Sequence, residues 1–374
     1  MERLLRLLLA CFLFIPLLSH GQDSYPFKIT QVAELFGIPW GMTFVSEHKL
    51  LVTERDGALT LIDTQTGKTS SLTGLPKDIH HQGQGGLLDA AISPDFEQTN
   101  WVYFSYSKNV DGLGATTLAR AKLDKLRLID WQDLLVTQSR TRTGAHFAGR
   151  IAFDDQGHVF MSIGDRGARA NAQNLKNHAG TIIRLRLDGQ LPDDNPFIND
   201  DSALPEIWTY GHRNPQGLFF NLETKQLWSN EHGPRGGDEI NLIKKGKNYG
   251  WPTISYGKEY ASPFAVGEGT HKTGMEQPLK VYIPSIAPSS LMQYRGDAFP
   301  AWKGQLFSGA LKLRHLNKVV PSNTSKIIDE TRLLNALDER IRNVIEGPDS
   351  LIYIATDSGK ILSLSPNSNS ESQE

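Results

Sequence analysis

The sequence predicts an all-β protein, specifically a six-bladed β-propeller whose blades are four-stranded antiparallel sheets. A strand–turn–strand unit recurs six times at intervals of roughly 60 residues, a period that suits repeated multi-stranded sheets. Asp-Gly and other Gly-containing turns separate the apolar runs, as in antiparallel hairpins. Segments with a helical period are scarce. These features favour a radial propeller over a solenoid, because a solenoid repeat is shorter and stricter.

The six units account for most of the chain. Each begins with an apolar strand, turns at polar or Gly residues and returns in a second strand. Their ranges are 40–63, 87–107, 149–165, 214–243, 289–319 and 342–365. The segment 27–35 also alternates like a strand, and we expect it to supply the missing outer strand of the last blade, which would close the ring. The best helix candidate is 330–339, with a loop as the alternative.

The termini predict export and a frayed end. Arg3 and Arg6 precede an apolar run at 7–18 that is too short for a comfortable membrane span, so residues 1–21 read as a cleaved signal peptide. We expect a catalytic propeller domain at 22–365, a polar tail at 366–374 and a periplasmic location. Cys11 is the only cysteine, and lipid attachment there stays open. The mature chain would contain neither disulfides nor thiolate chemistry.

The composition excludes several classes of partner. The 374 residues include 39 basic and 41 acidic side chains, and this near-neutral balance argues against nucleic-acid binding. No later segment is apolar enough to span a membrane. The 34 glycines and 19 prolines suit a turn-rich globular protein.

The segment 211–252 is irregular enough to suggest a loop shaped for a ligand. It packs Gly, Pro, Asn, Asp and Arg residues between two apolar runs. Glu239 and the backbone carbonyls of Gly233 and Pro234 are hard oxygen ligands of the kind that calcium takes. Arg213 adds a planar donor fork for an oxygen or a carboxylate.

Polar residues near the strand ends of several repeats would converge in a ring. Because three arginines and a lysine fall among them, the mouth of the propeller is expected to attract a small polyanion. The residues are Gln84, His146, Asp165, Arg213, Asn214, Lys312, Arg340 and Arg342.

Several motifs resemble those of the soluble quinoprotein glucose and aldose sugar dehydrogenases. They are GQGGLLD, GRIAFDDQGHVFMSIGDRG, GHRNPQG, HGP with DEIN, and KNYGWP, and their order covers nearly all of the mature chain. The resemblance implies a six-bladed propeller that binds pyrroloquinoline quinone (PQQ) and calcium. Because its loops are short, the sequence resembles the aldose sugar dehydrogenase branch more than the glucose dehydrogenase branch.

The resemblance also implies roles for individual residues. His146 would accept the proton, and Arg213 and Asn214 would lie beside the quinone oxygens. Further cofactor contacts would come from Gln84, Tyr260, Lys312, Arg340 and Arg342. The carbonyls of Gly233 and Pro234 would hold a catalytic calcium, and Glu239 and Tyr249 would belong to a separate structural calcium site. The implied reaction oxidises the anomeric carbon of an aldose to a lactone by hydride transfer to the quinone.

Simpler interpretations accompany these roles. Asp165 orients His146 or merely caps a turn, and Glu239 pairs with a neighbouring lysine instead of calcium. Trp40 is assigned to the blade core and His232 to packing or hydrogen bonding. Two other functions stay open: a calcium-dependent lactonase or esterase, and a non-catalytic sugar-binding propeller. An aldose substrate and an unidentified electron acceptor are the expected partners, and the chain is a monomer or a homodimer.

Overall fold

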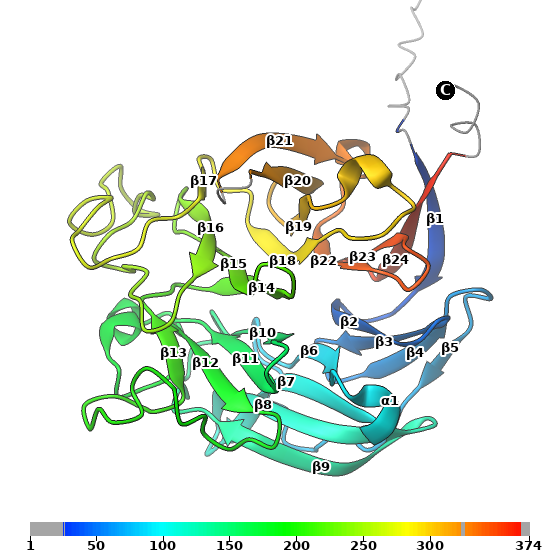
Figure 1. Cartoon of the computed structure of the whole chain (residues 1–374), viewed down its shortest axis with the longest axis horizontal. Coiled ribbons are helices and arrows are strands. Elements are labelled where there is room, and N and C mark those ends of the chain that lie inside the picture. Colours follow the sequence, from blue (N-terminus) through cyan, green and yellow to red (C-terminus); the bar gives the residue numbers. More distant parts are fainter. Residues whose placement is uncertain (1–24, 26, 323–325, 368–374) are drawn as a thin grey trace, which may run out of the picture.

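The chain forms a closed ring of six sheets, as predicted (Figure 1). The computed structural model describes residues 25, 27–322 and 326–367. The predicted signal peptide, Cys11 and the end of the predicted tail lie outside these residues. Each sheet has four antiparallel strands, and consecutive blades follow each other around the ring in chain order.

The first three blades follow the chain without interruption. Blade 1 contains β2 (Pro39–Ser46), β3 (Lys49–Glu54), β4 (Leu59–Asp63) and β5 (Thr69–Ser71). Blade 2 contains β6 (Leu87–Ile92), β7 (Trp101–Val110), β8 (Leu113–Asp124) and β9 (Arg127–Val136). Blade 3 contains β10 (Ala148–Phe153), β11 (His158–Ile163), β12 (Thr181–Arg186) and β13 (Ile207–Tyr210).

The last three blades include the one that joins the two ends of the chain. Blade 4 contains β14 (Pro215–Asn221), β15 (Gln226–Glu231), β16 (Asp238–Ile243) and β17 (Lys280–Tyr282). Blade 5 contains β18 (Pro288–Gln293), β19 (Leu306–Ala310), β20 (His315–Pro321) and β21 (Ile327–Leu333). Blade 6 contains β22 (Ile341–Glu346), β23 (Ile352–Thr356), β24 (Lys360–Pro366) and β1 (Phe27–Glu34).

Strand β1 closes the ring as the sequence suggested. It pairs antiparallel with β24, from Phe27 opposite Pro366 to Glu34 opposite Lys360. Its Phe27 packs edge-on against Phe299 and Trp302 of blade 5. The first described strand therefore fastens the last blade to its neighbour.

Local sequence explains the hairpins and the packing between blades. Asp111-Gly112 joins β7 to β8 with two positive φ values, 54° and 79°, as a type I′ turn requires. Alternating apolar side chains fill the spaces between adjacent sheets in separate clusters, such as the one that joins Tyr103 of blade 2 to Ile151 and Met161 of blade 3.

The expected helix at 330–339 was wrong. Residues up to Leu333 continue β21, which pairs with β20, and Asn335–Leu337 forms one 3₁₀ turn. Pairing to the open edge of blade 5 outweighs the helical preference of a short segment. The other short helical turns are α1 (Phe96–Thr99), η1 (Arg169–Gln173) and η2 (Pro300–Trp302). No helix among the described residues is long and apolar enough to cross a membrane.

Candidate active site

Residues near one end of the first two strands of the blades supply most of the site. The innermost strands β2, β6, β10, β14, β18 and β22 pack side by side around the ring axis. Because each inner strand runs antiparallel to the next strand of its blade, the residue before the first and the residue after the second lie at the same end. Every one of these six pairings also has a register irregularity at that end. Such bulges re-aim side chains beside functional sites.

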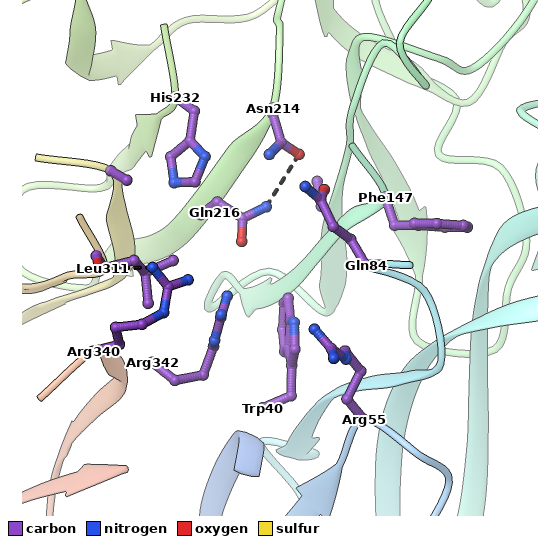
Figure 2. A pocket seen from close by; sticks show the side chains of 12 residues that line it. Trp40, Arg55, Gln84, Phe147, Asn214, Gln216, His232, Leu311, Arg340 and Arg342 are labelled. Atoms are coloured by element: carbon purple, nitrogen blue, oxygen red, sulfur yellow. Dashed lines mark hydrogen bonds between the residues drawn. The ribbon is translucent and has the colours of Figure 1, made fainter. Parts of the chain in front are cut away.

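A cavity opens where these positions meet (Figure 2). Three of its side chains, Trp40, Gln216 and Arg342, lie within the irregular stretches of their inner strands. The complete lining is Trp40, Arg55, Gln84, Phe147, Ala148, Asn214, Gln216, His232, Ala287, Leu311, Arg340 and Arg342.

Three guanidinium groups give the cavity its positive charge. Asp357 accepts hydrogen bonds from Arg342 at 2.8 and 2.9 Å and from Arg340 at 2.8 Å. Arg55 has no ion pair with any described residue, and its buried Nε has no hydrogen-bond partner among them. Burial, and then the charges of Arg342 and Arg340, lower the pKa of Arg55. The cavity therefore has more positive than negative charge in its lining.

A buried ion pair contacts two residues of the cavity lining. Arg150 and Asp89 are 2.7 Å apart, and both are almost fully buried. The guanidinium of Arg150 lies 4.3 Å from the centre of the Trp40 ring and donates to the Gln216 carbonyl at 3.1 Å. These contacts hold Trp40 and Gln216 in place, so these two parts of the lining are fixed before any ligand binds.

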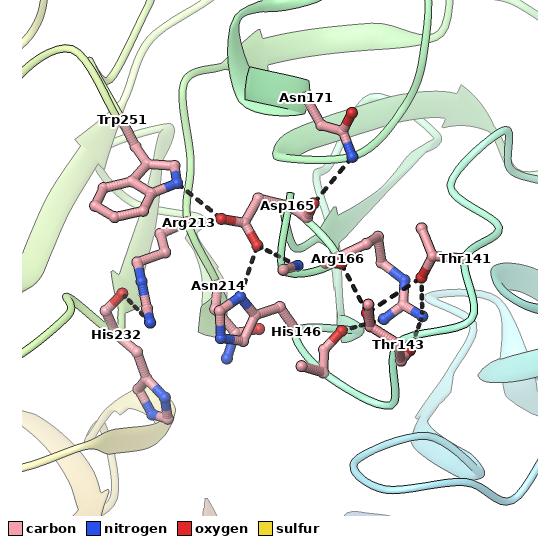
Figure 3. Close-up of polar contacts among 12 residues, drawn as sticks. Thr141, Thr143, His146, Asp165, Arg166, Asn171, Arg213, Asn214, His232 and Trp251 are labelled. Carbon is pink, nitrogen blue, oxygen red and sulfur yellow. Dashed lines mark hydrogen bonds and ion pairs between the residues drawn. The ribbon is translucent and has the colours of Figure 1, made fainter. Parts of the chain in front are cut away.

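His146 and Asp165 form a hydrogen-bonded pair near this cavity (Figure 3). His146 Nδ1 is 2.6 Å from Asp165 Oδ1, while Asp165 Oδ2 accepts from the Trp251 indole at 2.8 Å. Although burial opposes ionisation, the hydrogen bonds from His146, Gly167 and Trp251 hold the pKa of Asp165 below its ordinary value. A charged Asp165 accepts the proton on Nδ1, so in the neutral imidazole the lone pair is on Nε2.

The next strand end brings Arg213 and Asn214 to the same place. Arg213 is buried and donates to the His232 carbonyl at 3.2 Å and to the Tyr260 hydroxyl at 3.4 Å. Asn214 accepts a hydrogen bond from Gln216 at 3.1 Å through its side-chain oxygen. Its amide nitrogen therefore stays available as a donor. Tyr260 itself is 64% exposed, at the outer edge of the site.

His232 is a neutral imidazole in the wall of the cavity. Its Nε2 lies 2.7 Å from the Pro288 carbonyl, so this nitrogen carries the proton. Burial and the nearby positive charge of Arg213 lower the pKa of His232 to about 3. The ring therefore adds a hydrogen-bond acceptor, without charge, to a lining dominated by donors.

A second, smaller pocket adjoins Arg213. Glu231 and Glu239 both line it, and Asn241 donates to the two carboxylates at 3.2 and 3.1 Å. Burial, and then the charge of Glu231, raise the pKa of Glu239 to about 8. Gly233 and Tyr249 line the same pocket, and Pro234 follows in the chain. Glu231 is paired with His212, whereas half-buried Glu239 has no cationic partner among the described residues, and such a carboxylate favours a cation nearby.

The lysine interpretation of Glu239 was wrong for the described side chains. Lys244 pairs with Glu276 and Lys245 with Asp194, and neither reaches Glu239. No group of three or more His, Cys, Asp or Glu side chains in the described part of the chain could hold a metal ion. A cation in this pocket would therefore depend on backbone carbonyl oxygens as well as carboxylates.

Comparison with known proteins decides the family. A family model described as Glucose / Sorbosone dehydrogenase matches residues 36–363. The chain belongs to the glucose/sorbosone dehydrogenase family. It is accordingly an oxidoreductase.

Individual relatives agree with this family membership. The aldose sugar dehydrogenase YliI of Escherichia coli (strain K12) is 41% identical over 336 residues, which cover 88% of this chain and 90% of that protein. Quinoprotein glucose dehydrogenase B of Acinetobacter calcoaceticus is 27% identical over 401 residues, covering 85% and 83%. The crystal structure of the soluble E. coli aldose sugar dehydrogenase in the apo-form matches with a TM-score of 0.87 at 38% identity, covering 91% of this chain and all of that one.

This glucose/sorbosone dehydrogenase family member brings together most of the residues that the sequence singled out. Gln84, Asn214, Arg340 and Arg342 line the cavity, and Gln84 also accepts the His146 backbone N–H at 2.8 Å. Lys312 lies at the correct end, after β19, but its exposed side chain is not part of the lining.

Sequence reasoning missed the places of Trp40, His232 and Arg55 in the lining, and that of Asp357, which pairs with Arg340 and Arg342 beside it. Trp40 is buried as predicted, yet its ring forms part of the lining, and His232 does the same. Arg55 and Asp357 were not singled out at all. Each directly follows the second strand of its blade, as does His232, so comparing this one position across the repeats would have found all three.

Proposed function

We propose that this family member oxidises the anomeric carbon of aldose sugars to lactones with bound PQQ and calcium, and that His146 is the proton acceptor. The observation that supports this most directly is the surplus of guanidinium charge in the cavity beside the His146–Asp165 pair. Arg340 and Arg342 share the carboxylate of Asp357, and Arg55 has no ion pair with any described residue. PQQ has three carboxylates, which arginine recognises by charge-assisted hydrogen bonds.

The cavity fits PQQ in its donor set as well as in its charge. The buried, unpartnered Nε of Arg55 is a donor without an acceptor, which a bound carboxylate would supply. Gln84, Asn214, Arg340 and Arg342 would add donors around the rim, and Trp40 would offer an aromatic surface. Arg213, Lys312 and Tyr260 would contact the quinone from the side of the mouth. A neutral sugar alone would leave Arg55 without a compensating charge.

The second pocket fits calcium. The raised pKa of Glu239 reflects a carboxylate that lacks a compensating positive charge. Calcium would be held at Glu239 and Tyr249, and a catalytic calcium at the carbonyls of Gly233 and Pro234. The described residues also leave the buried Asn241 Oδ1 without a hydrogen-bond partner in this neighbourhood.

The side chains of this chain would carry the proton and the charge. When bound, PQQ supplies an ortho-quinone that accepts a hydride. His146 would take the hydroxyl proton of the sugar at Nε2, because Asp165 holds Nδ1–H at 2.6 Å and stabilises the imidazolium that forms. Arg213 would direct its guanidinium at developing negative charge. These roles assign His146, Asp165 and Arg213 to catalysis.

The test reconstitutes the purified protein. PQQ and calcium are added, the sample is desalted, and a panel of aldoses is supplied with an artificial dye as electron acceptor. We expect dye bleaching with several aldoses and a quinone spectrum that survives desalting. No turnover on any aldose, together with loss of the quinone, would reject the proposal. A calcium-dependent lactonase or a non-catalytic sugar-binding propeller would give that result.

Calcium binding has its own test. Adding calcium to chelator-treated protein is expected to raise the unfolding temperature, because the ion binds only the folded state. Glu239→Gln should lose much of this increase, while Glu276→Gln, at an exposed pair with Lys244, should keep it. An equal calcium response in all three proteins would remove Glu239 from the calcium site.

Location and partners extend the proposal. The N-terminal segment 1–21 would direct export to the periplasm, and the electrons would leave to an unidentified acceptor. Fractionation of cells that express the full chain tests the location. The protein recovered from the periplasm should lack residues 1–21.

A further inference from the structure

Arg166 is a buried arginine that the proposed reaction does not use. It follows Asp165 in the turn Gly164–Gly167, and its side chain is completely buried. Its guanidinium forms no ion pair with any described residue, although the Asp165 carboxylate raises its pKa against the larger lowering effect of burial. A charged group buried in this way needs a full set of hydrogen bonds.

Those hydrogen bonds all go to the segment before His146 and to its neighbours (Figure 3). The guanidinium donates to the carbonyls of Ser139 at 3.3 Å, of Thr143 at 3.1 Å and of Ala145. It also donates to the Thr141 hydroxyl at 3.2 Å and to the Gly114 carbonyl at 3.4 Å. In return, the Thr143 hydroxyl donates to the Arg166 carbonyl at 2.7 Å.

The segment that Arg166 holds has an unusual backbone. His146 and Ala148 both have positive φ, 53° and 55°, a region that residues with a Cβ rarely adopt. Such conformations persist where the surroundings fix them. Phe147, between the two, lies with its ring centre 3.3 Å from the Arg166 guanidinium carbon and lines the cavity.

We propose that Arg166 is a positioning residue for His146. Asp165 and Arg166 are adjacent, yet they act on different parts of the same target: Asp165 holds the His146 ring, and Arg166 holds the backbone that carries it. The segment 139–147 would otherwise relax from its positive-φ conformation and move the ring away from the cavity. This inference rests on the proposed function of His146, but the restraint on the segment is a property of the protein without cofactor.

The first experiment measures that restraint directly by amide hydrogen exchange in the cofactor-free protein. Arg166→Lys keeps a positive charge but replaces a planar fork by one ammonium, and Arg166→Met removes the charge. Arg184→Lys is the matched control, because Arg184 is also buried in blade 3, lies 4.2 Å over the Trp208 ring and hydrogen-bonds Asn195. We expect faster exchange within 139–147 in both Arg166 variants and unchanged exchange there in the control.

The second experiment follows the reaction. Arg166→Lys should lower kcat on the order of 10²-fold with little change in KM, because a displaced base costs rate more than substrate binding. The same substitution in a His146→Gln background should have almost no further effect on kcat, since the two residues act through one group. PQQ retention after desalting should remain at the wild-type level.

Each outcome decides the proposal. Unchanged exchange within 139–147, or an equal loss of kcat with and without His146, would overturn it. If Arg166→Met fails to fold, the Arg166→Lys results decide alone. If the wild-type protein oxidises no aldose, the proposed function fails, and the exchange experiment still shows whether Arg166 restrains the segment.

Discussion

Arg55 shows how one side chain changes the chemistry of the cavity. Without it, Arg340 and Arg342 would face one carboxylate, Asp357, with both guanidinium groups paired. With it, the cluster has a buried donor that no described residue satisfies. Natural proteins rarely leave such a group unpaired, so an anionic ligand is the simplest explanation. The same reasoning gives Asp357 the role of holding Arg340 and Arg342 in place.

Arg55→Gln is therefore expected to weaken PQQ binding. A hydrogen bond to a charged group contributes about 1.5–3 kcal/mol, which corresponds to a loss of affinity of roughly 10- to 100-fold. Fluorescence titration of the calcium-loaded protein with PQQ measures this. Arg186→Gln, at an exposed pair with Asp193, is the control and should bind as wild type does. Equal affinities for all three proteins would contradict the assignment.

His232 predicts a loss of stability in acid. Its pKa in the folded state is about 3, below the ordinary histidine value of 6.5. Between these two pH values the unfolded chain binds a proton at this residue and the folded chain does not. The stability is therefore complete above about pH 6.5 and falls as the pH decreases toward 3. Urea unfolding across this range should show a smaller decrease for His232→Gln. The exposed His271→Gln protein should follow wild type.

At the scale of elements, strand β1 contributes more to stability than its edge position suggests. Its Phe27 is 4% exposed and packs against Phe299 and Trp302 across the boundary between blades 5 and 6. Phe36, nine residues later, is fully exposed in the loop before β2. The two phenylalanines therefore allow a comparison between a ring-closing contact and a surface position.

Phe27→Ala should lower the free energy of unfolding by about 3–5 kcal/mol, the usual cost of removing a buried phenylalanine. Phe36→Ala should change it by less than about 0.5 kcal/mol, as expected for a surface position. Denaturant unfolding of both variants measures the difference. A small effect at Phe27 would mean that blade 6 is stable without its outer strand.

For the whole molecule, the sequence predicted the ring better than the site. Alternating strands and Asp-Gly turns are local signals, so the six units could be predicted from the sequence alone, as could the closure of the ring by 27–35. The prediction of a helix at 330–339 failed because the conformation of this segment depends on pairing with β20, which lies outside the segment itself. His146 and Asp165 were singled out through motifs. The Asp165 carboxylate makes both of the contacts that the sequence left as alternatives, to His146 at 2.6 Å and to the turn N–H of Gly167 at 2.8 Å.

Arg55 and Asp357 could not be found from local sequence. Each follows a strand and precedes a turn, where charged residues are common. They are about 300 residues apart, and only closure of the ring places them around one cavity. Their shared position, directly after the second strand of a blade, is apparent only when the blades are compared with one another.

The pairing of β1 with β24 has a consequence for synthesis. A ribosome makes the partner of the earliest strand last, so blade 6 cannot assemble until translation is nearly complete. Until then Phe27 lacks its aromatic neighbours, and the cavity lacks Arg340, Arg342 and Asp357. A nascent chain of this protein would accordingly remain open, and its cavity would be incomplete until the last blade is made.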